Sequence, residues 1–328
     1  MKRLRYLIPL MFFVIGVLFS VCGDASAVGR PVKEAYSEPI KIAYLPYQIG
    51  DTVGAAWGVG MDRELSAFPN VTLQKFDGQA SAETQVRIMS ELINQKYDAI
   101  ILQAGDSAAL AHSTREAEEA GIPVITLNLG VDTSHAGHIA MVDYEAGALV
   151  ASEIAKAIKG EGNVVIIQAT PGNTRGELLE SGFRDEMSKH PNVNILESQT
   201  GEWMTEKANV VMTDFLTKYP KINGVFCHND AMAAGASQAA AAVGRLEEMV
   251  IWGADGEAKA LEYIEEGRLA GTIYTNCYDQ GATAARLALY LIGGGVDTSA
   301  YTTTPIIKMS PIIATPDTVM NIGPSIRW

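Results

Sequence analysis

The chain has 328 residues, of which 48% are hydrophobic and 19% are charged, a composition that favours one or two compact domains over a disordered chain. Lysine and arginine total 25 against 38 aspartates and glutamates, and the net charge of −13 argues against a nucleic-acid or anionic-membrane surface. No fixed-period repeat is present, so solenoids and fibres are excluded as well.

The N-terminus has the pattern of an export signal. Basic residues within 2–5 precede an apolar run over 7–21, and small residues at 25–27 provide a signal-peptidase site. The apolar run is short for a membrane span, which needs about 20 residues. Residues 1–27 are therefore predicted to be a signal peptide, with acylation of Cys22 in a lipoprotein as the alternative. Either way the protein works outside the cytoplasm.

Residues 28–39 are polar and contain proline, which predicts a flexible leader, and folded structure is expected from about Ile40. From there, short apolar runs alternate with longer segments of helical periodicity. The predicted strands lie at 40–46, 71–76, 99–103, 123–127, 163–168, 193–198, 223–227, 249–252 and 270–275.

Two of the intervening helices have clear boundaries. One spans 144–159, with Asp143 as its predicted cap and an apolar face that includes Val150 and Ile154. The other is an alanine-rich helix that follows Asp230 and ends at Gly244.

Continuous apolar strands separated by helices indicate parallel sheets covered on both faces, so the predicted class is α/β. These units exceed what one ordinary sheet holds, and the polar stretch 135–143 is a candidate crossover between two sheets. The prediction is therefore two Rossmann-like lobes, with functional residues at the carboxyl ends of the strands.

Polar side chains recur at those strand ends. Carboxylates accept hydrogen bonds and amides both donate and accept, so together they match the hydroxyls of a polyol. Asp230 is expected to cap its helix rather than to bind a ligand, and an isolated asparagine could instead stabilise a turn. The candidates from this pattern are Tyr47, Asp51, Asn128, Asn229, Asp255 and Asn276.

Signals for other functional classes are weak. The chain has no Gly-x-Ser-x-Gly elbow, Walker loop or complete dinucleotide fingerprint, since the glycines at 58–60 lie in a predicted helix. His135, His138 and His228 are expected at the surface or in the cleft, without a carboxylate cluster that would bind a metal. No catalytic residue, metal or cofactor is predicted, and residues 1–39 lack the DNA-binding head of a sugar-responsive repressor.

The motifs IPVITL at 122–127, GVFCHNDAMAAGA at 224–236, WGADG at 252–256 and GRLAGTI ending at Ile273 resemble the periplasmic sugar-binding proteins of the ribose-binding type. The resemblance implies a type I periplasmic-binding-protein fold, in which two lobes joined by a three-strand hinge close on a sugar. Hinge crossings are then expected near 142–143, 276–277 and 308. This divides the chain into an N-terminal lobe of 40–142 plus 277–308 and a C-terminal lobe of 143–276 plus 309–328.

The family's ligand residues transfer to this chain one position at a time. Its cleft asparagine falls on Asn229, its aspartate in the GxDG motif falls on Asp255, and its last-strand polar residue falls on Asn276. The aromatic residue that stacks on the sugar ring falls on Trp203, although packing alone is an equal alternative.

Other positions depart from the family pattern. Asn128 stands where relatives have an aspartate followed by a bidentate arginine. The second cleft arginine falls on Glu177, with Arg175 two residues earlier, and either side chain could enter the pocket. The first-lobe aromatic pair is missing, so stacking from that lobe depends on Tyr47 or Trp57.

These departures favour a related pentose, hexose, cyclitol or linear polyol over ribose. A carboxylate at Glu177 further raises the hypothesis of an amine-bearing ligand. The resemblance implies delivery of the ligand to an ABC permease, with a chemoreceptor as a further partner and a monomeric state. Cys227 and Cys277 could form a disulfide in an oxidising space or remain buried thiols.

Overall fold

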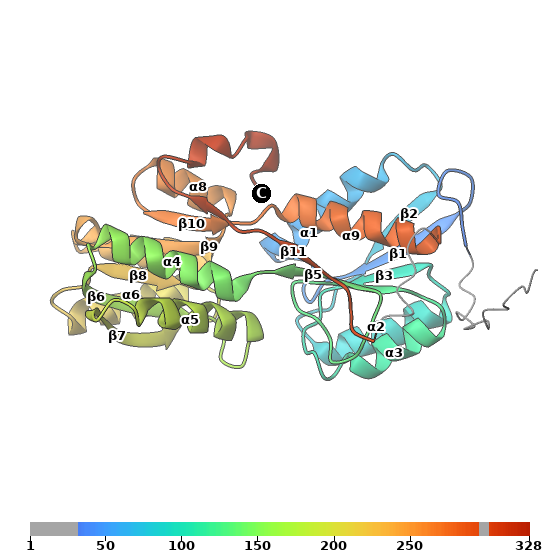
Figure 1. Ribbon diagram of the computed structural model, residues 1–328, viewed down its shortest axis with the longest axis horizontal. Helices are drawn as coiled ribbons and strands as arrows, with labels where there is room; N and C mark the ends of the chain where they lie inside the picture. The colour runs from blue at the N-terminus through green and yellow to red at the C-terminus, as the bar shows by residue number, and fades with distance from the viewer. Residues whose placement is uncertain (1–31, 295–301) are drawn as a thin grey trace, which may run out of the picture.

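The computed structural model describes residues 32–294 and 302–328, which form two lobes lying side by side (Figure 1). Each lobe contains a six-stranded sheet with helices packed on it, so the predicted α/β class with two Rossmann-like lobes is confirmed. The predicted signal peptide and Cys22 lie outside the described residues. Within the described part of the chain, no helix combines the length and apolar character of a membrane span.

The sheet of the first lobe is entirely parallel, with strand order β11-β5-β4-β3-β1-β2. Helices α1 and α9 pack together against one face, and α2 and α3 pack together on the other (Figure 1). The elements of this lobe are β1 (Ile40–Leu45), α1 (Thr52–Leu65), β2 (Val71–Lys75), α2 (Ala82–Asn94), β3 (Ala99–Leu102), α3 (Ala111–Glu119), β4 (Val124–Leu127), β5 (Gly137–Met141), α9 (Cys277–Ile292) and β11 (Ile306–Met309).

The sheet of the second lobe has the order β12-β10-β9-β8-β6-β7, and only its β10–β12 pair is antiparallel among the described strands. Helices α4 and α5 cover one face, and α6, α7 and α8 cover the other. The elements are α4 (Asp143–Ala157), β6 (Glu161–Gln168), α5 (Thr174–Met187), β7 (Asn192–Thr200), α6 (Thr205–Lys218), β8 (Gly224–Cys227), α7 (Asp230–Ala242), β9 (Val250–Asp255), α8 (Ala258–Glu265), β10 (Gly271–Tyr274) and β12 (Ile312–Ala314), with short 3-10 helices at Leu246–Glu248, Val319–Asn321 and Pro324–Ile326.

All nine strands expected from the sequence are present; inner strands such as β3 and β8 are fully buried, whereas the edge strands β2 and β7 are mostly half-buried or exposed. Three further strands were not expected. The stretch 135–143 was interpreted as a crossover, but its residues 137–141 form β5 inside the first sheet, and the crossover follows it. The strands β11 and β12, between which the chain passes from one sheet to the other, are short and partly exposed, so they lack the apolar signal of a buried strand.

Two helix caps were assigned one residue away from their true positions. Asp143 is not the cap of α4 but its first helical residue, and its carboxylate pairs with Arg175 instead. The cap of α7 is Asn229, whose side chain accepts a hydrogen bond from the Met232 amide at 2.9 Å. The interpretation of Asp230 as that cap was therefore wrong.

Glycines set the distance between the paired helices. A Cβ atom on Gly60 of α1 would lie 1.9 Å from the carbonyl oxygen of Tyr278, and one on Gly281 of α9 would lie 2.0 Å from that of Trp57. Only a residue without a side chain allows the two backbones to approach this closely. This contact fixes α9 against the first lobe, although α9 directly follows β10 of the second lobe in the chain.

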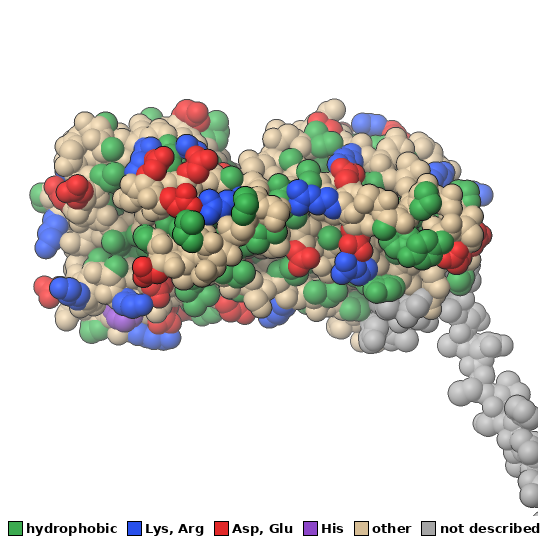
Figure 2. All heavy atoms as spheres, turned by 90° about the horizontal axis from the view of Figure 1, so that it is seen from above, with side chains coloured by type: hydrophobic (Ala, Val, Ile, Leu, Met, Phe, Trp, Pro, Cys, Tyr) green, Lys and Arg blue, Asp and Glu red, His purple; other side chains and the backbone are tan. Residues whose placement is uncertain are grey.

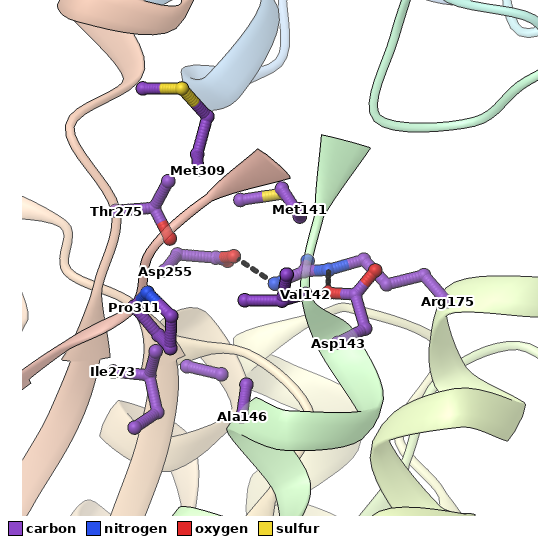
Figure 3. Close-up of a pocket in the computed structure, with 11 residues that line it drawn as sticks. Met141, Val142, Asp143, Ala146, Arg175, Asp255, Ile273, Thr275, Met309 and Pro311 are labelled. Atoms are coloured by element: carbon purple, nitrogen blue, oxygen red, sulfur yellow. Dashed lines mark hydrogen bonds and ion pairs between the residues drawn. The ribbon is translucent and has the colours of Figure 1, made fainter. Parts of the chain in front are cut away.

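The chain passes between the lobes after β5, after β10 and between β11 and β12. Residues from all three crossings enclose a cavity of about 10 Å³, which has room for about one water molecule (Figure 3). Figure 2 shows the lobes as two masses joined across the middle of the molecule, with an indentation between them at the upper edge, and charges of both signs are scattered over that face.

Several smaller predictions also have structural outcomes. Cys227 and Cys277 are free, buried thiols, so the disulfide alternative is wrong. His135 and His228 are buried rather than placed at the surface or in the cleft. The part of the expected flexible leader that the structure describes packs on the first lobe, where Lys33 Nζ lies 2.7 Å from Asp98 Oδ1.

Candidate functional site

A cavity of about 360 Å³ lies between the lobes, within the usual range of small-molecule sites. Its lining combines amides, carboxylates, one guanidinium and two aromatic rings. In both lobes most of these groups come from residues that follow a strand or begin a helix. The lining residues are Tyr47, Gln48, Asp51, Thr52, Val53, Gln103, Ala104, Gly105, Asn128, Leu129, Asn173, Arg175, Trp203, Asn229, Ala231, Asp255 and Glu257.

Tyr47 follows β1 and is held by a chain of amide side chains. Its backbone N–H donates to Gln103 Oε1 at 3.0 Å, and the Gln103 carbonyl accepts from Gln85 Nε2 at 2.7 Å. Gln85 is fully buried on α2, and its Oε1 accepts from the Gly105 amide at 2.8 Å. A Cβ atom on Gly105 would lie 2.2 Å from the Tyr47 ring, so glycine is needed for the ring to occupy this place.

Asp51 and Asn128 complete the first-lobe wall. Asp51 caps α1, because its Oδ1 accepts from the Gly54 amide at 2.8 Å. Burial raises the pKa of Asp51, and that hydrogen bond opposes the rise. Asn128 follows β4, and its Oδ1 is buried without a hydrogen-bond partner among the residues that the structure describes. A buried acceptor without a donor is costly, so this atom is suited to accept from a ligand.

In the second lobe, Asp230 holds the turn that follows β9. Its Oδ2 accepts from the amides of Gly256 at 2.7 Å and Glu257 at 2.8 Å, and its Oδ1 accepts from Thr272 Oγ1 at 2.6 Å. Burial raises the pKa of Asp230 to about 6, against these hydrogen bonds. The contacts place the side chains of Asp255 and Glu257 in the cavity wall.

Arg175 projects from the first turn of α5 and bridges two carboxylates (Figure 3). Its Nε lies 3.1 Å from Asp143 Oδ1, and its Nη2 donates to Asp255 Oδ1. Burial alone lowers the pKa of Arg175, but Asp255 and Asp143 outweigh burial and raise it, so the guanidinium stays charged. For both aspartates burial raises the pKa and Arg175 opposes the rise.

Trp203 is positioned by backbone and side-chain contacts together. Asn229 Nδ2 donates to the Trp203 carbonyl at 3.3 Å, while the Arg175 guanidinium carbon lies 5.5 Å from the centre of the indole ring. Asn229 thus caps α7 and anchors the Trp203 loop from the edge of the cavity.

Three lining residues have positive φ angles that side-chain-bearing residues seldom adopt: 63° at Asn128, 65° at Trp203 and 138° at Asp255. Such strain costs about 1–3 kcal/mol per residue and gathers at ligand sites, where the surrounding structure enforces it. Five other non-glycine residues with positive φ lie outside the lining, and the three in this wall are compatible with a ligand-binding role for the cavity.

Most of the candidates from the sequence meet in this cavity, namely Tyr47, Asp51, Asn128, Arg175, Trp203, Asn229 and Asp255. Glu177 is exposed outside it, so of the two alternatives near the start of α5 the structure places Arg175 at the cavity. Asn276 caps α9 through the Asp279 amide at 3.1 Å and is not a lining residue. Trp57 is fully buried, with its Nε1 donating to Gln280 Oε1 at 2.7 Å, which leaves Tyr47 as the first-lobe aromatic.

The sequence interpretation missed Gln103, Asn173 and Glu257, although each carries a readable signal. Gln103 follows β3 as Asn128 follows β4, and the strand-end rule applies equally to both. Asn173 caps α5 by accepting from the Gly176 amide at 3.1 Å, beside the cavity. Glu257 follows the GxDG motif directly. No group of three or more potential metal ligands gathers anywhere in the described ranges.

Comparison with known proteins agrees with this geometry. Residues 42–295 match the model of the periplasmic binding protein domain. A D-allose-binding periplasmic protein of Escherichia coli is 27% identical over 84% of this chain and 87% of its own length. A xylitol-binding protein of Mycolicibacterium smegmatis is 31% identical over 66% of this chain and 62% of its own length.

Among solved structures, an ABC transporter periplasmic solute-binding protein of Actinobacillus succinogenes with bound D-allose superposes with a TM-score of 0.80. It is 29% identical, and the match covers 86% of this chain and 99% of the other.

Proposed function

Because the chain belongs to the periplasmic binding protein family, we propose that it captures a sugar or polyol between its lobes and delivers it to an ABC importer. The observation that carries this proposal is the 360 Å³ cavity whose polar lining comes from both sheets. The similarity to proteins that bind D-allose and xylitol supports the same class of ligand.

The proposed roles follow from the chemistry of each side chain. Tyr47 and Trp203 offer flat apolar faces to the C–H side of a sugar ring. Asn128 and Asn229 exchange hydrogen bonds with hydroxyl groups, and Arg175 donates to ring or hydroxyl oxygens. Asp51 and Asp255 accept hydrogen bonds from ligand donors. Glu177 and Asn276 have no place in this set, because neither lines the cavity.

The proposed domain division assigns 40–142 plus 277–308 to the N-terminal lobe and 143–276 plus 309–328 to the C-terminal lobe. The division is supported by the strand order, in which β11 joins the first sheet and β12 joins the second. A ligand that contacts both lobes binds the closed arrangement more tightly and therefore shifts the hinge equilibrium towards it. The permease then recognises the closed protein.

An extracytoplasmic location goes with the family, whose relatives are periplasmic. We propose export through residues 1–27 as a signal peptide, with a lipid anchor at Cys22 as the alternative route. We further propose that the protein is a monomer. A chemoreceptor is proposed as a second partner besides the permease. The family consists of binding proteins, and we assign this chain no catalytic step and no cofactor.

The test is a thermal-shift screen of the chain from residue 28 onwards against pentoses, hexoses, amino sugars, cyclitols, alditols and small non-sugar metabolites. A ligand that binds only the folded state raises the melting temperature once its concentration exceeds Kd. We expect a concentration-dependent shift with one polyhydroxylated class. A response confined to non-sugar metabolites would contradict the proposal.

A further inference from the structure

Acidic side chains outnumber basic ones among the residues that line the cavity. Its charged lining residues are Asp51, Arg175, Asp255 and Glu257. The single guanidinium among them is already neutralised, because Arg175 pairs with both Asp143 and Asp255 (Figure 3). The carboxylates of Asp51 and Glu257 therefore face the cavity without a compensating protein cation among the lining residues.

Glu257 is the more unusual of the two. Its backbone amide is fixed by Asp230, and its side chain is half-buried. Its carboxylate forms no hydrogen bond or ion pair with any residue in the described ranges. A carboxylate held at a cavity wall without a partner is costly to bury, and a ligand group of opposite charge removes that cost.

The groups around Glu257 are mostly acidic. Burial raises its pKa to about 8, and the carboxylates of Asp230 on α7, Asp255 on β9 and Asp51 before α1 add to the rise. Arg175 on α5 opposes it. Asp51 belongs to the opposite lobe, so carboxylates of both lobes oppose the ionisation of Glu257, and at pH 7 its side chain is mostly protonated without a ligand.

Both lobes contribute polar groups to the cavity whose acceptor atoms have no partner or only a partial one. Asp51 interacts with the backbone amides of Gly54 and Val53, whereas the side chain of Glu257 and the buried Oδ1 of Asn128 have no hydrogen-bond partner among the described residues. A hydroxyl group brings one donor to such a site. An ammonium group brings three donors and a positive charge.

We propose that the ligand is an amino sugar or amino polyol whose protonated amine lies between Asp51 and Glu257, while its hydroxyl groups occupy the Arg175 and Asn229 side of the cavity. The inference rests on the proposed function and narrows its ligand class. It assigns to Glu257 the cationic recognition that the sequence had placed at Glu177. The cation compensates the charge of Asp51 and favours the ionised form of Glu257, which then pairs with it.

The experiment is isothermal titration calorimetry at pH 7 with matched ligands: glucosamine against glucose, galactosamine against galactose, an amino cyclitol against myo-inositol, and the N-acetylated form of each amine. In at least one series we expect the amine to bind about tenfold or more tightly than both its hydroxyl parent and its N-acetyl form. Glu257→Gln should remove that preference, so that the amine and its neutral parent bind the variant with similar affinity. Glu177→Gln, an exposed control on the same lobe, should retain the preference.

The release of protons on ligand binding is a second test of the role of Glu257, independent of the affinities. If an ammonium group fixes Glu257 in its ionised form, binding at pH 7 releases protons, and the apparent enthalpy differs between phosphate and Tris buffers. Glu257→Gln should abolish this buffer dependence. A neutral sugar that binds as tightly as its amino counterpart, or an amine preference that survives Glu257→Gln, overturns this inference and leaves the proposed function standing. Failure of every sugar, polyol and amine to bind overturns both.

Discussion

At the scale of single residues, stability should depend strongly on Arg175, because it compensates two buried carboxylates. Asp143 and Asp255 are 7% and 3% exposed, and both contact the guanidinium. Arg175→Met leaves these carboxylates buried without a cation, which costs about 3 kcal/mol at neutral pH. Chemical denaturation of the variant and the parent measures the difference.

The pH dependence of that loss has a defined sign. Burial raises the pKa of Asp143 and Asp255 and Arg175 opposes the rise, so removing Arg175 moves both folded-state pKa values further above the unfolded value of about 3.9. Groups with raised pKa values bind protons in the folded state and lose stability as pH increases. The deficit of Arg175→Met should therefore be larger at pH 8 than at pH 5, and an equal deficit at both would contradict the account.

The histidine cluster beside β4 gives a prediction of the opposite sign. Burial, followed by the charge of His135, lowers the pKa of His138 to about 4, although Thr126 opposes the shift. The unfolded chain then binds more protons between pH 6.5 and 4, so the folded state loses stability as pH falls through that window. His138→Gln should flatten this loss relative to the parent in denaturation curves at pH 7 and pH 5.

The denaturation experiment on His138→Gln needs a comparison variant and must take account of a second buried histidine. His112 is exposed, with a side-chain accessibility of 79%, so His112→Gln is the comparison variant for replacing a histidine at the surface. Burial also lowers the pKa of His228 to about 4, so part of the loss should persist in His138→Gln. An unchanged slope in His138→Gln would show that this imidazole does not contribute.

Residue roles were harder to read from the sequence than residue positions. Strand ends directed attention to the right loops, because parallel strands bring their carboxyl ends to one edge. The position of a residue in the sequence, however, could not decide which of two residues close together in the chain has its side chain in the cleft. Arg175 and Glu177 differ by two positions on a helix and so point in different directions, and Asn229 and Asp230 exchange the capping role by a single residue.

At the scale of elements, the close crossing of α1 and α9 should tolerate no side chain. Gly281→Ala places a methyl group 2.0 Å from the Trp57 carbonyl oxygen, so the helices must separate. Overpacking of this kind costs about 2 kcal/mol, which exceeds the gain in helix propensity of about 1 kcal/mol. Thermal unfolding should show a lower melting temperature.

Gly323→Ala is the matched control for that substitution. A Cβ atom there meets nothing within 4 Å, and the φ of −63° suits alanine. Its stability should stay within about 0.5 kcal/mol of the parent. If Gly281→Ala behaved like this control, the helix crossing would have to be looser than described.

The elements themselves were largely predictable, since strands buried on both faces need uninterrupted apolar runs. β5 escaped notice because His138 interrupts its run, and the imidazole is accommodated only through Thr126 Oγ1, 2.8 Å from His138 Nδ1. That partner lies on the neighbouring strand β4, a pairing that local sequence patterns do not encode. β12 likewise depends on a distant, antiparallel partner, β10.

At the scale of the whole molecule, both sheets direct polar groups into one cavity, and the three crossings meet in a second, much smaller one. Arg175 and Asp255 line both cavities, and Asp143, the partner of Arg175, follows the first crossing. A ligand that engages Arg175 or Asp255 thus contacts side chains next to the crossings. Under the proposed function, this arrangement links ligand binding to closure of the lobes.

The most direct test of that account is small-angle X-ray scattering of the parent and of Asp255→Ala, with and without the ligand found in the screen. The parent should show a smaller radius of gyration when the ligand is added. Asp255→Ala should keep its folded circular-dichroism spectrum and show no decrease at the same ligand concentration. Binding to the parent without any change in the radius of gyration, or normal closure of Asp255→Ala, would contradict a cleft that closes on its ligand.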